Sequence, residues 1–442
     1  MLDIKFIREN IDAVKKSIKA RHLDVDADKL LALDEKRRKS IRELEDLQAA
    51  HNRISEEIAS LPLSAREAKI TESKELKIRV QQDSETLEAI QKEFEALLLE
   101  VPNILADGVP EGKDESENKA VRSWGEPKKF DFQPKDHVEL GTALDVIDIA
   151  RAGKVAGARF AYLKGGAALL EFALIQHVLH TLTSSDKVRE IADTMERGYS
   201  HKPFVPVVPP VMIRPDVLKR MARLSEADKD ERYHLSQDDL YLVGSAEHTI
   251  GSMHMDEILE ECDLPLRYIG FSTSFRREAG SYGRDIRGIL RMHQFDKLEM
   301  ESFTAKDNAL NEQNFFVAIQ EYLMRSLEVP YRVVMICTGD MGKPDARQID
   351  IEAWLPSQNT YRETHTSDYM ADYQARRLNT RVRSKDGTLS FAHMNDATAF
   401  AIGRTIIAIM ENYQQEDGSV RIPEVLRPYM GGKEFIAKEP KE

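Results

Sequence analysis

Residues able to bind an anion and an aromatic base are concentrated in one segment, FSTSFRREAGSYGRDIRGILRMHQFDKLEM at 271–300. Strand alternation in its first half places Arg276 and Glu278 on one face, and its second half aligns Phe295 and Glu299. An arginine donates two parallel hydrogen bonds to a phosphate or carboxylate, an aromatic ring stacks on a base, and a carboxylate accepts from an exocyclic amine. The segment therefore predicts a β-hairpin suited to a nucleotide, although a solvated hairpin with surface ion pairs has the same composition.

Other short runs have the β-branched and aromatic content of strands, and several are separated by glycine-containing loops. These runs are FVPVVPPVM, LYLVGSAEH, LRYIGFSTSFRRE, YRVVMICTG and DIEAWL. Consecutive strands of this kind pair as hairpins, so we expect an α+β catalytic domain with an antiparallel sheet flanked by helices. The loop within the nucleotide-binding segment carries Gly280, Gly283, Arg284, Arg287 and Gly288.

A second arginine is singled out by the helix that it occupies. The apolar stripe of this helix consists of Ile402, Ile406, Ile409 and Tyr413, and Arg404 points away from it. Arg404 is therefore either directed toward a ligand or engaged in a surface salt bridge.

The N-terminal hundred residues contain few Gly or Pro and are predicted to be helical, beginning with a short amphipathic helix near 3–20. Apolar residues then recur in alternate steps of three and four over 44–61 and 76–101, interrupted by the sequence LPLS. This spacing is the narrow seam of a coiled coil, broken only by His51 and Asp83. It predicts an antiparallel helical hairpin with arms of roughly 35 residues, about 50 Å long.

The charge is unevenly distributed along the chain. The net charge is −13, but residues 1–80 carry 18 Lys and Arg against 16 Asp and Glu, so their net charge is +2 and that of the remainder is −15. A polyanion would therefore be steered toward the N-terminal part. Basic residues of the hairpin that could contact RNA include Arg38, Arg42, Arg53, Lys74 and Lys77, although solvated flanks of a coiled coil have the same composition.

The composition changes at 102–135, which is rich in Pro, Gly and charged residues and is typical of a linker. We therefore divide the chain into a helical domain at 1–110, a linker at 111–135 and a catalytic domain at 136–442.

Several other classes of protein are disfavoured by the composition. No apolar run of the 442 residues approaches the ~18 needed to cross a membrane, and the start MLDIKFIREN lacks the apolar segment of a secretion signal, so we expect a cytoplasmic protein. Cys262 and Cys337 are far apart and lack a C-x-x-C partner. We expect both to be reduced and in or near the core, without a disulfide framework or a four-ligand zinc site.

The string F-R-x-E, followed by a Gly/Arg loop and H-Q-F-x-K-x-E, resembles motif 2 of the class II aminoacyl-tRNA synthetases. Further strings resemble the seryl-tRNA synthetase family of bacterial type and cover nearly the whole chain. They lie at 101–112, 206–212, 337–356, 361–381 and 399–432. PVVPPVM resembles motif 1, whose proline lies at the family's dimer interface, and the last string resembles motif 3 and the C-terminal tail.

The resemblance implies that ATP is bound by Arg276, Glu278, Phe295, Glu363, Thr366 and Arg404. Arg276 would bridge the α-phosphate and the serine carboxylate, and Arg276 and Arg404 would be the catalytic residues. Glu278 would accept a hydrogen bond from the adenine amine, while Phe295 and Arg404 would lie on opposite faces of the ring. Glu363 and Thr366 would provide oxygen ligands for Mg²⁺ bound with ATP.

The serine-binding residues implied by the resemblance are Ser245, Glu247, Arg276, Glu299 and Thr398. Ser245 replaces the family's threonine, and its separation of two from Glu247 would place both on one strand face, near the ammonium group. Glu299 and Thr398 would bind the side-chain hydroxyl. A site that pairs a buried hydroxyl rejects an analogue without one, because its polar groups are then left unpaired.

Two positions depart from the family pattern. Thr366 stands where serine is usual, which preserves a hydroxyl. The family has an asparagine two residues before Thr398, but ungapped counting places Asp396 there, with Asn395 adjacent. The chain therefore has either a substitution or a one-residue shift at this point.

The implied activity is ATP-dependent ligation of L-serine to tRNA(Ser) through a seryl-adenylate. The implied enzyme is a homodimer whose hairpin grips the long variable arm of the tRNA. The same enzyme would also serylate tRNA(Sec). No histidine is assigned to catalysis, and His293 is expected to have a hydrogen-bonded structural role. Two alternatives are a synthetase-like enzyme that loads an amino acid onto a carrier and a non-catalytic RNA-binding dimeric scaffold. The two distant cysteines disfavour the zinc-dependent archaeal type.

Overall fold

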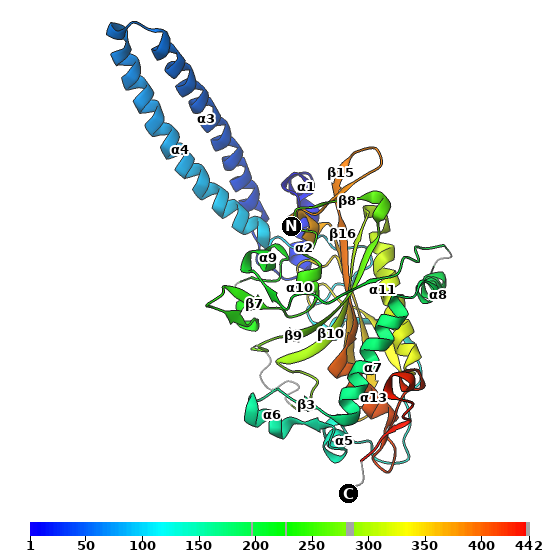
Figure 1. Ribbon diagram of the computed structural model, residues 1–442. Coiled ribbons are helices and arrows are strands. Elements are labelled where there is room, and N and C mark those ends of the chain that lie inside the picture. Colours follow the sequence, from blue (N-terminus) through cyan, green and yellow to red (C-terminus); the bar gives the residue numbers. More distant parts are fainter. Residues whose placement is uncertain (196–197, 226–227, 280–286, 439–442) are drawn as a thin grey trace. The chain divides into compact units, whose positions relative to one another are not determined.

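The computed structural model describes residues 1–195, 198–225, 228–279 and 287–438, and the chain forms two compact units, Met1–Ile104 and Leu105–Glu442 (Figure 1). Gly280, Gly283 and Arg284 of the predicted loop lie outside the described residues. Within the described ranges, none of the helices combines the length and the apolar character needed to cross a membrane.

The first unit consists of helices only. They are α1 (Ile4–Glu9), α2 (Ile11–Ala20), α3 (Ala27–Ser60) and α4 (Arg66–Glu100). The amphipathic helix predicted near 3–20 is divided in two, because Asn10, at φ −132° and ψ 39°, interrupts the helical backbone. The Asp26 side chain caps α3 by accepting a hydrogen bond from the Lys29 N–H at 2.8 Å.

The long helices α3 and α4 form the predicted antiparallel hairpin (Figure 1). The predicted seam residues are all buried or half-buried, whereas most of their neighbours in sequence are exposed. These residues are Leu44, Leu47, His51, Ile54, Ile58 and Leu61 on the first arm, and Leu76, Val80, Asp83, Leu87, Ile90, Phe94, Leu97 and Val101 on the second. Spacing in threes and fours thus identified the packed face of both arms correctly.

The second unit is built around an eight-stranded sheet, counted over the described residues, in the order β1-β11-β12-β13-β16-β10-β9-β4. The bounds are β1 Lys119–Trp124, β11 Tyr331–Met335, β12 Arg347–Leu355, β13 Thr360–Ala371, β16 His393–Ala401, β10 Gln294–Thr304, β9 Leu266–Phe275 and β4 Val205–Val207. Neighbouring strands are antiparallel, except that β4 runs parallel to β9 at one edge. The expected antiparallel sheet is confirmed, and β1 lies within the segment 111–135.

Helices pack against this sheet and enclose the core (Figure 1). The longer ones are α7 (Gly165–Leu182), α8 (Ser185–Met195), α11 (Ala309–Ser326) and α13 (Ile402–Tyr413). The shorter ones are α5 (His137–Ala143), α6 (Ile149–Val155), α9 (Pro215–Arg220), α10 (Glu247–Ile250) and α12 (Tyr373–Leu378). On α13 the predicted apolar stripe is correct, because Ile402, Ile406 and Ile409 are buried and Tyr413 is half-buried.

Small sheets complete the second unit. They contain β15 (Leu389–Phe391), β14 (Arg381–Arg383) and β8 (Ile258–Glu260); β17 (Val420–Arg421) and β18 (Phe435–Ile436); β2 (Ile147–Asp148) and β3 (Tyr162–Leu163); and β5 (Met212–Ile213), β7 (Leu240–Leu242) and β6 (His234–Leu235). Both cysteines are free, as expected, but only Cys337 is buried, whereas Cys262 is exposed.

Candidate active site

The predicted hairpin exists, but its strands are shorter at the loop end than alternation suggested. β9 ends at Phe275, which pairs with Gln294 at the start of β10. Arg276 and Glu278 therefore lie beyond the strand, and Glu278 has a positive φ of 51°, so no strand alternation sets their directions. The Arg276 N–H donates to the His293 carbonyl at 3.0 Å, and His293 Nδ1 lies 3.0 Å from the Arg276 carbonyl. His293 thus has the structural contacts expected of it.

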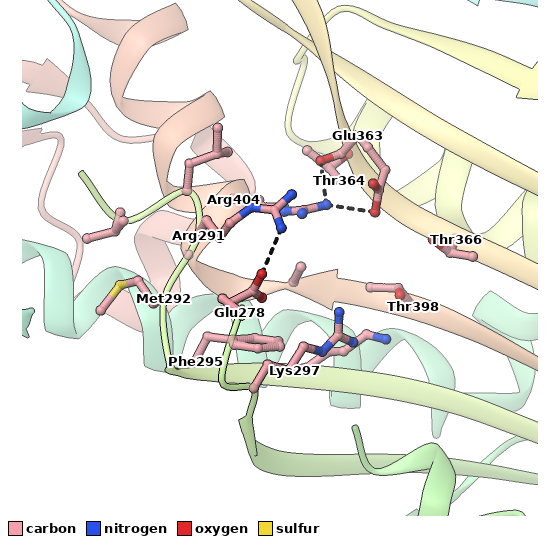
Figure 2. Close-up of a pocket in the computed structure, with 15 residues that line it drawn as sticks. Glu278, Arg291, Met292, Phe295, Lys297, Glu363, Thr364, Thr366, Thr398 and Arg404 are labelled. Atoms are coloured by element: carbon pink, nitrogen blue, oxygen red, sulfur yellow. Dashed lines mark hydrogen bonds and ion pairs between the residues drawn. The ribbon is translucent and has the colours of Figure 1, made fainter. Parts of the chain in front are cut away.

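A pocket at the end of this hairpin brings the predicted nucleotide-binding residues together (Figure 2). Its lining includes Arg276, Glu278, Phe295, Glu363, Thr366, Thr398 and Arg404, which are all six of the residues assigned to ATP and two of the five assigned to serine, Arg276 and Thr398. They come from the hairpin, from β13 and β16, and from α13. The sheet order explains this, because β13, β16 and β10 are adjacent although they are distant in sequence.

Arg404 is directed into the pocket by an ion pair rather than lying on the outer surface. Its Nη1 donates to Glu363 Oε1 at 2.7 Å and to the Glu363 carbonyl at 3.0 Å. The Glu363 carboxylate raises the pKa of Arg404 above its usual value. Burial raises the pKa of Glu363, but Arg404 lowers it and leaves it below its usual value. Both groups are therefore charged at neutral pH.

On the opposite wall, Arg276 and Glu278 are each held by a neighbour. Arg276 Nε donates to the Gly244 carbonyl at 3.2 Å, and the guanidinium carbon lies 5.3 Å from the centroid of the Phe295 ring. Arg291 Nη1 donates to Glu278 Oε2 at 2.7 Å. An arginine, an aromatic ring and a carboxylate thus line one cavity, and these are the groups that the sequence predicted for a nucleotide.

The other three residues assigned to serine, Ser245, Glu247 and Glu299, are buried, do not line the pocket and form a deeper layer. Ser245 and Glu299 are each 1% exposed, and Ser245 Oγ donates to Glu299 Oε2 at 3.0 Å. Lys297 forms an ion pair with Glu299, and Glu299 lies opposite Thr398 in the register of β10 and β16. Burial raises the pKa of Glu299 and outweighs the opposing effect of Lys297.

One structural prediction for this layer was wrong. Ser245 and Glu247 do not share a strand face, because β7 ends at Leu242 and Glu247 begins the short helix α10. The error came from extending the strand through Gly244, where the chain turns. Ser245 still reaches the layer through Glu299, whereas Glu247 pairs elsewhere.

Arg223 is a half-buried cation that sequence reasoning did not identify. Its Nε lies 2.6 Å from Glu247 Oε1, and its Nη2 lies 3.6 Å from Asp396 Oδ2. Burial raises the pKa of Glu247, but Arg223 and its neighbours lower it to about 2. Burial and nearby carboxylates raise the pKa of Asp396 and of Glu301 well above the usual value. Asp396, at the position where the family has asparagine, thus has Arg223 as its cationic partner.

The missed residues differ in how visible they were in the sequence. Lys297 lies two residues from both Phe295 and Glu299, so strand periodicity placed it on the functional face, but it was given no role. Arg223 lies just after α9, in a segment without a motif, and no spacing indicates that it pairs with Glu247. Glu301 continues the β10 face, but its burial depends on the neighbouring strands.

The basic residues of the α3–α4 hairpin are not equivalent. Arg38 Nε lies 3.1 Å from Asp34 Oδ2, and the fully buried Asp34 also contacts Arg8 at 3.0 Å and Arg37 at 3.1 Å. This cluster fixes the base of the hairpin, so Arg38 is a poorer candidate for an RNA phosphate than the sequence suggested. The remaining candidates are exposed, and they are Arg42, Arg53, Lys74 and Lys77.

Among the described residues, no group of three or more His, Cys, Asp or Glu side chains has an arrangement suited to hold a metal ion. Glu363 and Thr366, the pair assigned to Mg²⁺, lie three residues apart on β13, and both line the pocket. Their oxygen atoms have the ligand chemistry that Mg²⁺ prefers, because Mg²⁺ is usually held by one or two carboxylates together with substrate phosphates.

Comparison with known proteins follows the same division of the chain. Residues 1–105 match the profile of the seryl-tRNA synthetase N-terminal domain, and residues 231–413 match the tRNA synthetase class II core domain (G, H, P, S and T). A serine–tRNA ligase from Dictyoglomus turgidum is 41% identical over 442 residues, covering 99% of this chain and 100% of that protein.

Solved structures are also similar over the full length. The seryl-tRNA synthetase of Pyrococcus horikoshii, complexed with ATP, is 35% identical with a TM-score of 0.87, and all of both chains is covered. The cytoplasmic serine–tRNA ligase of Naegleria fowleri, in complex with AMP, is 29% identical with a TM-score of 0.83, covering 100% of this chain and 99% of that one.

Proposed function

The chain belongs to the seryl-tRNA synthetase family, and we propose that it activates L-serine with ATP and transfers it to tRNA(Ser). In the first step a serine carboxylate oxygen attacks the α-phosphorus of ATP, and the bond to the bridging oxygen breaks, so that pyrophosphate leaves. In the second step the terminal adenosine hydroxyl of the tRNA attacks the seryl carbonyl, and AMP leaves. The convergence of Arg276, Phe295, Glu363, Thr398 and Arg404 on one pocket is the observation that carries this proposal.

The pocket residues divide the first step between them. Arg276 binds both the serine carboxylate and the α-phosphate, and so neutralises charge where the new bond forms. The adenine ring lies between Phe295 and Arg404, and its amine donates to Glu278. The ion pair between Arg404 and Glu363 positions the guanidinium for this contact. These groups act by orientation and electrostatics, without proton transfer by a side chain.

Glu363 and Thr366 are the residues that would hold Mg²⁺ with ATP, and Glu363 is kept ionised by Arg404. A bound Mg²⁺ would neutralise the phosphate charge. Serine would lie between the pocket and the deeper layer. Ser245 and Glu247, the latter paired with Arg223, would bind its ammonium group, while Glu299 and Thr398 would pair with its side-chain hydroxyl. Support for this assignment is the burial of Glu299 and its placement opposite Thr398.

The proposed reaction is tested by amino-acid-dependent exchange of pyrophosphate into ATP, measured with each of the twenty amino acids. We expect exchange with serine and background rates with the others. A carrier-loading enzyme would also show exchange but would not charge tRNA(Ser), and a non-catalytic scaffold would show no exchange. Charging of a tRNA(Sec) transcript tests the proposed extension to that substrate.

We assign tRNA binding to the hairpin, because its exposed cations extend along arms of 34 and 35 residues, about 50 Å long. A variant that joins Leu44 to Gln82 by a short Gly/Ser turn removes Arg53, Lys74 and Lys77 and retains the Asp34 cluster. We expect serine-dependent exchange to be unchanged and kcat/KM for tRNA charging to fall roughly tenfold to a hundredfold, because phosphate contacts dominate affinity for RNA. Both reactions are measured on the same purified variant.

Two full-length variants control this experiment. Lys74→Gln with Lys77→Gln should weaken charging partially and flatten its salt dependence. Lys69→Gln should have little effect, because its amine is already engaged by Glu57 at 3.1 Å and Glu72 at 3.0 Å. Full charging efficiency in the trimmed variant would mean that the hairpin is only a spacer.

The enzyme is proposed to act as a homodimer, as the motif 1 resemblance implies. β4 is an edge strand, and Val205 within it and Val208 directly after it are 55% and 88% exposed. Exposed apolar side chains at a sheet edge are typical of an interface. Analytical ultracentrifugation should give the mass of two chains and a monomer when Val208 is replaced by Lys.

A further inference from the structure

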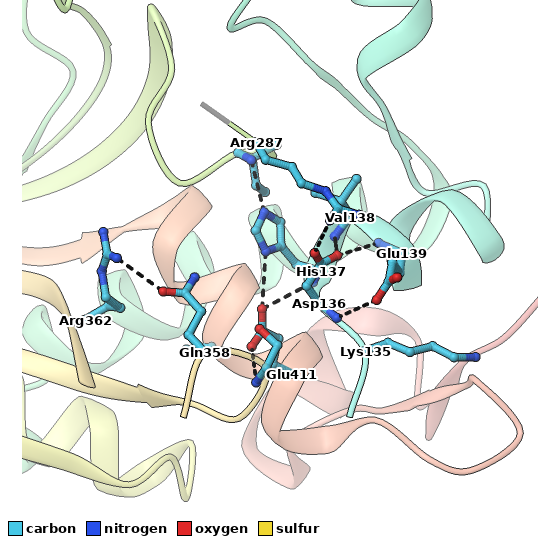
Figure 3. Close-up of polar contacts among 12 residues, drawn as sticks. Lys135, Asp136, His137, Val138, Glu139, Arg287, Gln358, Arg362 and Glu411 are labelled. Carbon is cyan, nitrogen blue, oxygen red and sulfur yellow. Dashed lines mark hydrogen bonds and ion pairs between the residues drawn. The ribbon is translucent and has the colours of Figure 1, made fainter. Parts of the chain in front are cut away.

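A buried histidine lies outside the nucleotide pocket and contacts the backbone of the segment that forms one wall of it (Figure 3). His137 is 4% exposed and begins α5. Its Nε2 accepts a hydrogen bond from the Ile289 N–H at 3.2 Å, and its Nδ1 lies 3.3 Å from Glu411 Oε1. Because a backbone N–H can only donate, Nε2 carries no proton, so Nδ1 carries it and donates to Glu411.

Glu411 fixes the orientation of this histidine and connects it to two other segments. Its Oε1 also accepts from the His137 backbone N–H at 3.2 Å, and its Oε2 accepts from the Ser357 N–H at 3.1 Å. Glu411 is fully buried on α13, two helical turns after Arg404. The helix that carries Arg404 therefore also holds the histidine that contacts Ile289.

The backbone before Ile289 packs so closely against His137 that no side chain fits between them. Gly288 has a φ of +85°, and a Cβ at this position would lie 1.9 Å from His137 Nε2. Arg287 Nη1 lies 3.2 Å from Oδ2 of Asp136, which caps α5. On the other side, a Cβ on Gly403 would meet the Ile289 carbonyl at 3.3 Å. Ile289 is thus enclosed between α5 and the start of α13.

The segment that follows Ile289 forms the wall of the nucleotide pocket. Residues 289–292 all line the pocket, and Arg291 Nη1 donates a hydrogen bond to Glu278 Oε2 at 2.7 Å. A shift of the Ile289 backbone would therefore displace Arg291, and with it the carboxylate proposed to accept from the adenine amine. His137 does not line the pocket, so any effect on the nucleotide must pass through this segment.

We propose that His137 is a positioning residue for ATP: locked by Glu411, it holds the Ile289 backbone and thereby the wall formed by residues 289–292. This inference rests on the proposed function, in which the pocket binds ATP. It concerns the nucleotide rather than serine, because Arg291 in this wall holds Glu278, the carboxylate proposed to contact adenine, whereas Ser245 and Glu299 lie in the deeper layer.

Two substitutions separate positioning from a general contribution to folding. In His137→Gln the amide oxygen can reach the place of Nε2 and accept from Ile289, whereas in His137→Asn the shorter amide reaches only the place of Nδ1 and contacts Glu411. We expect KM for ATP to rise about five- to tenfold in H137N and less than about twofold in H137Q. KM for serine and the melting temperature should be similar in the two variants.

A third substitution disturbs the contact between His137 and Ile289 by changing the Ile289 segment, and it replaces neither His137 nor Glu411. In Gly288→Ala the new methyl group would collide with His137, so the segment must shift. We expect the same rise in KM for ATP, and little further rise when H137N is added. His177→Asn is the matched control, because His177 is also buried and bonded to Ser326 at 2.8 Å, but does not line the pocket.

The measurements are serine-dependent pyrophosphate exchange, with each substrate varied in turn, and direct binding of ATP by calorimetry without serine. The proposal is overturned if folded H137N and G288A bind ATP as the wild type does, or if H137Q is impaired as much as H137N. If the wild type binds ATP but shows no serine-dependent exchange, only the proposed function is refuted. The role of His137 would still be tested by comparing the dissociation constants for ATP of the variants and the wild type. If the wild type does not bind ATP, both proposals fail.

Discussion

Alanine is expected to be activated about 10⁴-fold less efficiently than serine, as measured by kcat/KM in pyrophosphate exchange. Glu299 is buried beneath the pocket and already engages Ser245 and Lys297, so a substrate without a hydroxyl would leave polar groups unpaired there. The size of the effect follows from burial, since water could form the missing hydrogen bonds if the same groups were exposed.

The variant Thr398→Val tests the origin of this selectivity. Valine has nearly the same shape as threonine but cannot form a hydrogen bond, so kcat/KM for serine should fall about tenfold while that for alanine stays the same. Comparable kcat/KM values for alanine and serine in the wild type would remove serine from the proposal. An equal loss for both substrates in T398V would move hydroxyl recognition away from Thr398.

Replacing Arg276 by alanine is expected to lower kcat/KM for serine-dependent exchange several hundredfold. The guanidinium is held by the Gly244 carbonyl and lies beside Phe295, so its charge is preorganised for the α-phosphate and the serine carboxylate. Loss of such a contact typically costs about 3–4 kcal/mol of transition-state stabilisation. Arg276→Lys should recover only part of the activity, because an ammonium group cannot donate two parallel hydrogen bonds.

The adjacent arginine provides the matched control for this substitution. Arg277 does not line the pocket, so Arg277→Ala should retain nearly wild-type exchange. Circular dichroism and the melting temperature establish that both variants are folded. Exchange at the wild-type rate in folded R276A would exclude Arg276 from the first chemical step.

The hairpin and the main residues of the candidate ATP pocket could be predicted from the sequence for different reasons. The seam of α3 and α4 is a local pattern, since side chains three and four residues apart share a helix face wherever the helix lies. The pocket residues were identified by their motifs, because Arg276, Phe295, Glu363 and Arg404 occur in recognisable strings. Their convergence depends on the sheet order, which places β13, β16 and β10 side by side.

Local patterns failed where the chain turns. Alternation was extended through Glu278 and through Ser245 to Glu247, but these residues lie beyond strand ends, and their side chains are directed by contacts with Arg291, Glu299 and Arg223. The basic residues of the hairpin were treated alike, although the i,i+4 spacing of Asp34 and Arg38 on α3 already allows an ion pair. Only the folded unit buries Asp34 and adds Arg8 to its contacts, and this distinguishes Arg38 from the exposed Arg42.

The sequence by itself determined the helical hairpin, the antiparallel sheet of the second unit, the family and the six candidate ATP-binding residues that meet in one pocket, because periodicity and ordered motifs are properties of the chain. Tertiary structure alone decided which charges are compensated and which backbone groups are held. Arg223 between Glu247 and Asp396, and His137 between Glu411 and Ile289, join segments that are distant in sequence. The energies of such contacts depend on burial and distance, and these exist only once the sheet and its helices have packed.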